Sequence, residues 1–140
     1  RLFHVGRLDM QSSGLIFYTN DGEFARLVSH PSSDVEKEYR VECGQDVPEE
    51  LLQRYQAGIT VQGERYQLKR YRFRSPRSLV LTLIEGKNRE IRQVFQCFRI
   101  PLRSIHRMRI GCVTDQGIPS GRYRRLEPEE IQWFRKRDKG

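Results

Sequence analysis

Apolar and polar residues alternate along several short stretches of the chain, and this period of two is typical of β-strands with one buried face. The clearest case is KEYRVEC at 37–43, where Lys37, Tyr39, Val41 and Cys43 share one face. Tyr39 is therefore expected to point inward. Runs rich in β-forming residues predict further strands at 14–20, 66–74, 78–86 and 104–111, the middle two forming a hairpin across Ser75-Pro76.

Apolar residues three and four apart, together with capping residues, predict four helices. The segment 21–30 begins with Asp21 as a cap and ends before Pro31, and the segment 48–57 has proline and two glutamates at its start. A third helix is expected at 88–98, with Asn88 as its cap and with Arg89 and Arg92 on one face, and a fourth at 127–136.

The predicted strands and helices interleave irregularly along the chain. This order favours an α+β fold with a mixed, mostly antiparallel β-sheet flanked by helices, and argues against a doubly wound parallel sheet. A chain of 140 residues has the length of one ordinary domain. Residues 1–140 are therefore expected to form a single domain, and the motif found directly after residue 1 suggests a piece of a longer protein.

The net charge of +8 is concentrated in the second half of the chain. Residues 1–64 contain 6 lysines and arginines against 11 acids, whereas residues 65–140 contain 20 against 7. Most of these cations are arginines, which bind phosphate in a bidentate manner. The pattern indicates a polyanionic partner, with nucleic acid as the first candidate, although a solvated basic face without a specific partner would give the same count.

Neither a metal site nor a disulfide framework is indicated by the sequence. The three cysteines, Cys43, Cys97 and Cys112, are odd in number and widely spaced, and we expect buried thiols in a reducing compartment. The three histidines are too scattered for a convincing metal site. No stretch is long enough to span a bilayer, and the start lacks the apolar core of a secretion signal, so a cytoplasmic location is expected.

Three stretches carry a specific resemblance when they are taken together: GRLDMQSSGLIFYTNDG, EKEYRV and EGKNREIRQVF. They are similar to the motifs around the catalytic aspartate, the K-x-Y-x-V strand and the third motif of the pseudouridine synthases, specifically the RsuA/RluB/RluE/RluF branch that modifies ribosomal RNA. The later segments IHRMRIG and PSGRYRRLEPEEI also resemble that branch. The resemblance implies the pseudouridine synthase catalytic fold over residues 1–140, with upstream sequence missing.

The resemblance implies three catalytic residues. Asp9 would be the nucleophile that converts a flipped-out uridine of ribosomal RNA to its carbon-linked isomer, acting either at carbon 6 of the base or at carbon 1′ of the ribose. A carboxylate can add to the nucleoside and leave again without a cofactor or metal. Arg92 would keep Asp9 ionised and fix its direction. Tyr39 would stack on the target base, and its hydroxyl is also a candidate proton acceptor.

Further residues are candidates for substrate binding. Arg89 and Arg7 are expected to reach the phosphates or backbone of the RNA. For Lys37, Lys87, Asn88 and Arg107 a structural role and an RNA contact are equally open, because caps, strand-edge charges and phosphate ligands use the same residue types. RNA is the expected partner, and neither a metal nor a membrane is expected. The sequence does not give the oligomeric state, and a monomer is favoured.

Each catalytic candidate could also have an ordinary structural role. An aspartate before x-x-Ser-Ser-Gly is commonly a turn former, a tyrosine on a strand is commonly a core residue, and an arginine on a helix is commonly solvated. The three together favour an enzyme over an RNA-binding module that keeps the fold without turnover. A glycoside hydrolase is a weaker alternative, since that chemistry uses a second carboxylate and Asp21 already serves as a cap.

Overall fold

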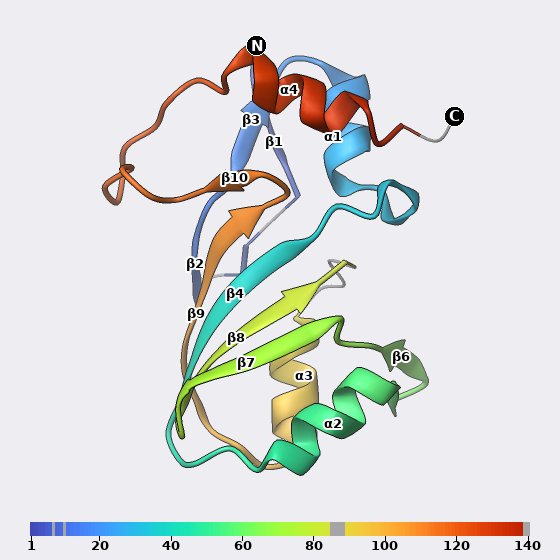
Figure 1. Ribbon diagram of the computed structural model, residues 1–140, viewed down its shortest axis with the longest axis vertical. Coiled ribbons are helices and arrows are strands. Elements are labelled where there is room, and N and C mark those ends of the chain that lie inside the picture. Colours follow the sequence, from blue (N-terminus) through green and yellow to red (C-terminus); the bar gives the residue numbers. More distant parts are fainter. Residues whose placement is uncertain (7, 10, 85–88, 139–140) are drawn as a thin grey trace.

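The computed structural model of the protein describes residues 1–6, 8–9, 11–84 and 89–138 (Figure 1). The strands are β1 Phe3–Val5, β2 Ser12–Gly14, β3 Phe17–Thr19, β4 Lys37–Cys43, β5 Ile59–Val61, β6 Glu64–Tyr66, β7 Arg70–Ser75, β8 Ser78–Leu83, β9 Leu102–Ile110 and β10 Val113–Thr114. The helices are α1 Gly22–Ser29, α2 Glu49–Ala57, α3 Glu90–Cys97 and α4 Pro128–Arg135, with a short 3₁₀ helix at Pro31–Ser33.

A six-stranded sheet with the order β10-β9-β4-β8-β7 forms the centre of the molecule, and β2 pairs with β9 beside this path. The β2–β9 pair is parallel, and the other pairs in the sheet are antiparallel. Two small antiparallel pairs, β1–β3 and β5–β6, complete the strands. The predicted α+β class with a mixed, mostly antiparallel sheet is therefore confirmed.

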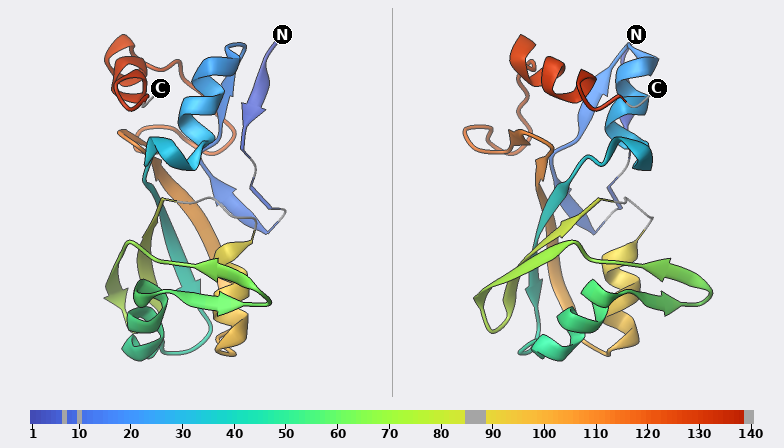
Figure 2. Two further views of the ribbon diagram at one scale, coloured as in Figure 1. Left: turned by 90° about the vertical axis from the view of Figure 1, so that its right-hand side faces the viewer. Right: turned by 45° about the vertical axis from the view of Figure 1, so that its right-hand side comes forward.

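Two apolar clusters hold the fold together, one toward each end of the long strands β4 and β9. The lower cluster packs α2 and α3 on one face of the sheet, and Figure 2 shows both helices on the same side of β4, β8 and β7. Its fully buried side chains include Val41, Leu81 and Phe95. The upper cluster joins β1, β3, α1 and α4 around Phe134. Strand β9 contributes Ile105 to the lower cluster and Ile110 to the upper one, so one continuous sheet links the two ends (Figure 1).

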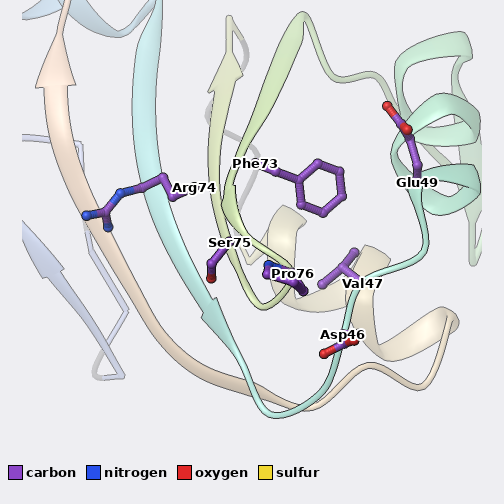
Figure 3. A pocket seen from close by; sticks show the side chains of 7 residues that line it. All are labelled: Asp46, Val47, Glu49, Phe73, Arg74, Ser75 and Pro76. Atoms are coloured by element: carbon purple, nitrogen blue, oxygen red, sulfur yellow. The ribbon is translucent and has the colours of Figure 1, made fainter.

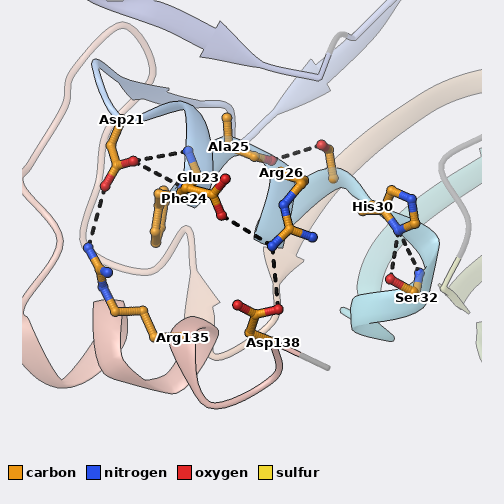
Figure 4. A network of polar contacts seen from close by, with 10 residues as sticks. Asp21, Glu23, Phe24, Ala25, Arg26, His30, Ser32, Arg135 and Asp138 are labelled. Carbon is orange, nitrogen blue, oxygen red and sulfur yellow. Dashed lines mark hydrogen bonds and ion pairs between the residues drawn. The ribbon is translucent and has the colours of Figure 1, made fainter. Parts of the chain in front are cut away.

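The helix ends follow from local chemistry. The side chain of Asp21 accepts hydrogen bonds from the backbone of Glu23 and Phe24, which caps α1 as the sequence predicts. Ion pairs then join α1 to the C-terminal segment: Arg135 contacts Asp21, and Arg26 contacts Asp138 (Figure 4). These exposed pairs contribute little stability. The stronger link is the burial of Phe134 of α4 against Phe17 of β3 and Phe24 of α1.

Several predicted boundaries are wrong. The run at 14–20 is not one strand, because Gly14 ends β2 and only Phe17–Thr19 forms β3. The helix expected at 88–98 begins at Glu90, and its N-cap is Arg89 in a left-handed conformation; the expected cap Asn88 lies outside the described residues. The prediction of buried thiols holds for Cys43 alone, since Cys97 and Cys112 are exposed.

None of the helices in the described ranges is long and apolar enough to cross a membrane. In the same ranges, no group of three histidine, cysteine, aspartate or glutamate side chains could hold a metal ion.

Candidate active site

Asp9 lies in the connection between β1 and β2, where its own side chain shapes the turn. One carboxylate oxygen, Oδ1, accepts hydrogen bonds from the backbone N–H of Gln11 at 3.0 Å and from the hydroxyl of Ser12 at 2.7 Å. The backbone N–H of Ser12 also donates to the carbonyl of Asp9. The turn-forming role considered from the sequence is therefore real. It uses only one of the two carboxylate oxygens.

The second oxygen of Asp9 is bound by an arginine from a distant helix. Arg92, on the first turn of α3, donates from Nε to Oδ2 at 2.9 Å. The side chains of Arg92 and Asp9 retain 15% and 22% of their exposure, so the ion pair is largely shielded while the carboxylate still reaches solvent. The fold thus joins two residues that are 83 positions apart in the sequence.

These contacts keep the Asp9 carboxylate ionised. Burial acts to raise the pKa of Asp9, but the hydrogen bonds from Ser12, Arg92 and Gln11 act in the opposite direction, and the pKa is lowered overall. A carboxylate that stays charged at neutral pH is able to act as a nucleophile or to stabilise a developing positive charge.

Tyr39 lies on the same face of the sheet as α3. Along β4, Lys37, Tyr39, Val41 and Cys43 point to one side, and Val41 and Cys43 belong to the cluster that packs against α3. Tyr39 is half-buried and packs on that cluster. Its hydroxyl has no hydrogen bond to the residues that the structure describes. An inward aromatic ring therefore lies on the face where α3 holds Asp9.

Arg107 and Lys37, for which the sequence allows either a structural role or an RNA contact, also lie on this face. Arg107 is the direct β9 partner of Tyr39, so their side chains share a face. It is 5% exposed and donates from Nε and Nη2 to the carbonyl of Leu15, at 2.9 and 2.6 Å. Lys37, two positions before Tyr39, is 8% exposed. Neither residue is the solvated surface charge that a basic sequence would suggest.

The remaining predicted binding residues are less defined. Arg89 is exposed at the N-terminus of α3 but precedes the first helical residue, so the helical spacing that was expected to align it with Arg92 does not apply. Arg7, Lys87 and Asn88 lie outside the described residues, and their roles stay predictions.

Sequence reasoning missed two features beside Asp9. Ser12 donates to the carboxylate, and a hydroxyl three positions after an aspartate is a recognisable turn signal. On the adjacent strands, the ring of His106 contacts Ser13 Oγ at 2.8 Å and Asp115 Oδ2 at 2.6 Å. This contact ties β2 to the segment after β10, and only the parallel register of β2 and β9 reveals it.

A shallow hollow of about 450 Å³ lies elsewhere, between β7 and the start of α2. Figure 3 shows Phe73 and Val47 lining it, with the side chains of Asp46 and Glu49 at its edge. Its lining includes none of the residues around Asp9. We assign it no function.

The fold corresponds to that of a class of enzymes that isomerise uridine within RNA. The chain belongs to the RNA pseudouridylate synthase family, whose sequence profile matches residues 1–97. The resemblance seen in the three sequence motifs is thereby confirmed.

Individual relatives agree with this membership. An uncharacterized RNA pseudouridine synthase of Borreliella burgdorferi is 42% identical over 137 residues, which cover 98% of this chain and 55% of that protein. The ribosomal large subunit pseudouridine synthase B of Haemophilus influenzae is 32% identical, over 96% of this chain and 39% of its own length. A crystal structure of a pseudouridylate synthase superimposes with a TM-score of 0.88 at 28% identity, covering 95% of this chain and 59% of that one. The chain thus spans about half the length of the proteins that it matches.

Proposed function

We propose that this chain is the catalytic domain of an enzyme that converts a specific uridine of ribosomal RNA to pseudouridine. The observation that carries the proposal is the ion pair between Asp9 and Arg92, formed inside the motifs of the family. The name of the Haemophilus influenzae relative supports ribosomal RNA as the substrate. A cytoplasmic location and a monomeric state remain predictions.

In this proposal Asp9 is the nucleophile that acts on a flipped-out nucleotide. The bond between N1 of uracil and C1′ of ribose breaks, the base rotates, and a bond from C5 to C1′ forms. The proton of C5 leaves and N1 acquires one, so the nucleotide keeps its composition. Asp9 adds at carbon 6 of the base or at carbon 1′ of the ribose and leaves at the end. Arg92 keeps the carboxylate ionised before it adds to the nucleotide and stabilises it again as it leaves.

Tyr39 supplies the surface against which the base rests. A base that leaves the RNA stack loses stacking energy, which an aromatic ring in the pocket restores. The half-buried ring of Tyr39 on the α3 face suits this role. The proposed substrate-binding residues are Arg7, Lys37, Lys87, Asn88, Arg89 and Arg107. The excess of arginine in the second half of the chain supports phosphate binding.

The test is the variant Asp9→Asn in a tritium-release assay with ribosomal RNA labelled at C5 of uracil. Asparagine retains an oxygen that accepts the turn hydrogen bonds from Gln11 and Ser12 but lacks the charge. We expect turnover to fall by more than about 10³-fold with RNA affinity nearly unchanged. The melting temperature should fall modestly, because the amide NH2 group of the asparagine cannot accept the hydrogen bond from Arg92. The matched control is Asp46→Asn, on an exposed aspartate that pairs with Arg77. Tritium release by Asp9→Asn at the wild-type rate would refute the nucleophile, and RNA binding without release by the wild type would leave an RNA-binding module.

A further inference from the structure

Lys37 and Arg107 form a buried pair of positive charges. Their side chains are 8% and 5% exposed, and Arg107 is close enough to lower the pKa of Lys37. The guanidinium of Arg107 is held by the carbonyl of Leu15. Within the described ranges, the ammonium of Lys37 has neither a hydrogen bond nor an ion pair. Two buried like charges lower the stability of the folded protein unless an anion binds between them.

The neighbouring acids are already bound to other groups. Glu36 binds Lys69, Arg70 and Arg109, and Glu38 binds Arg109. Glu38 lies between Lys37 and Tyr39 along β4 and therefore points to the opposite face of the sheet. Asp9 is occupied by Ser12, Gln11 and Arg92. Within the described part of the protein, none of these three acids forms an ion pair with Lys37 or Arg107.

The position of the pair indicates which part of the substrate it meets. Lys37 and Arg107 flank Tyr39, one along β4 and the other across to β9, on the face that carries α3. A flipped base enters deep into such a site, whereas the phosphates of an RNA strand stay near the surface, where the exposed arginines are. Lys37 and Arg107 are therefore expected to lie near the flipped base and away from the phosphates.

We propose that Lys37, supported by Arg107, is a further catalytic residue that stabilises the negative charge on the uracil ring while it is detached from the ribose. When the N1–C1′ bond breaks, its electron pair stays on the ring and is shared by N1 and the two ring carbonyl oxygens. The ammonium donates a hydrogen bond to this anion, and the charge disappears once C5 bonds to C1′. The inference rests on the proposed isomerase function.

The physical argument is that of an oxyanion site. A charged donor fixed in advance in a shielded position stabilises a charge that develops during the reaction more strongly than it stabilises the neutral substrate. The low pKa of Lys37, about 8 as a result of burial and then of the charge of Arg107, agrees with a site that lacks its anion in the free protein.

The test compares Lys37→Met, which keeps the length of the side chain but removes the charge, with Lys37→Arg, which keeps the charge. Steady-state kinetics on tritium-labelled ribosomal RNA should show a kcat about 100-fold lower for Lys37→Met. Because the phosphate contacts are elsewhere, KM should change less than threefold. Lys37→Arg should recover at least a tenth of the wild-type kcat. The control Lys136→Met, on an exposed lysine at the end of α4, should leave both constants unchanged.

Three results would overturn the assignment: an unchanged kcat in Lys37→Met, a raised KM with the wild-type kcat, or no recovery in Lys37→Arg. A raised KM with the wild-type kcat would indicate that Lys37 contacts a phosphate. No recovery in Lys37→Arg would indicate that the shape of the lysine side chain is required and not its charge. Absence of tritium release by the wild-type protein would instead refute the proposed function itself. The two failures are therefore distinguishable.

Discussion

Replacing Lys37 by methionine should make the protein more stable, in contrast to most substitutions of buried residues. Burial, and then the charge of Arg107, lower the pKa of Lys37 from 10.5 to about 8. At about 1.4 kcal/mol for each pH unit, keeping this ammonium charged in the folded protein at neutral pH costs on the order of 3 kcal/mol. A methionine of similar length removes that cost and fits the same space. We therefore expect a free energy of unfolding about 2–3 kcal/mol higher at pH 7.

The gain should depend on pH in a defined direction. Between pH 8 and 10.5 the unfolded chain still holds the Lys37 proton that the folded protein has lost. The unfolded state then binds more protons, so the unfolding free energy of the wild-type protein rises with pH across this window. Lys37→Met lacks this contribution, and its advantage should shrink from its full size below pH 8 to almost nothing near pH 10.5. Other groups that titrate there are common to both proteins and cancel.

Urea unfolding followed by circular dichroism at pH 7 and at pH 10 measures the difference between the two proteins. Lys136→Met serves as the control, because its side chain is exposed and the substitution should change stability by less than about 0.5 kcal/mol at either pH. A Lys37→Met variant that is less stable than the wild type at pH 7 would refute the reasoning. It would show that the ammonium has a stabilising partner in the folded protein.

Two further predictions concern the frame that holds the site. Glu36 accepts ion pairs from Lys69, Arg70 and Arg109, and hydrogen bonding by Arg70 against the opposing effect of burial holds its pKa well below 4.5. Chemical denaturation at pH 7 should show a free energy of unfolding about 1 kcal/mol lower for Glu36→Gln than for the wild type. Because ionised Glu36 is the form that stabilises the fold, this difference should shrink as the pH falls below 4.5 and the carboxylate becomes protonated. A difference that stays constant down to pH 2 would contradict the prediction. The second prediction concerns Gly14, which has φ +118° and lies so close to β9 that a Cβ would be 2.2 Å from the backbone oxygen of Arg107. Gly14→Ala should therefore separate β2 from β9. We expect a melting temperature lower by more than about 10 °C and reduced activity. Gly63→Ala, with φ +80° and open space around it, is the matched control with a loss of only about 1 kcal/mol, and equal losses in the two variants would rule out the clash.

The sequence predicts best those elements whose signals are local. The strand 37–43 has the bounds that its pattern predicts, since strict alternation over seven residues is typical of a half-buried strand and of no helix. The cap of α1 by Asp21 is equally readable. The prediction for Cys97 is wrong although the pattern contains the answer, because this residue falls between the apolar positions of α3 and so faces solvent.

Long-range geometry is less accessible from the sequence. The contact between Asp9 and Arg92 is expected only from the resemblance to a family, since no local pattern joins residues so far apart. The parallel pairing of β2 with β9, and with it the contact of His106 with Ser13 and Asp115, leaves no trace in the local pattern. Lysine is among the residues least often buried, so the alternation that places Lys37 on the face of Tyr39 gives no reason to expect its burial.

The fold pairs the negative charge of Asp9 but leaves the positive charge of Lys37 without a partner in the described ranges. This difference suggests a separate role for each residue in the reaction. Asp9 is satisfied in the free protein, because a turn and Arg92 occupy both its oxygens and favour its ionised form. Lys37 is not satisfied within the described ranges, although it is the more deeply buried of the two. A nucleophile has to be charged before the substrate arrives, whereas a group that stabilises a transient anion gains its partner only during the reaction. Selection for activity would therefore be expected to retain a buried cation such as Lys37 even though it lowers the stability of the free protein.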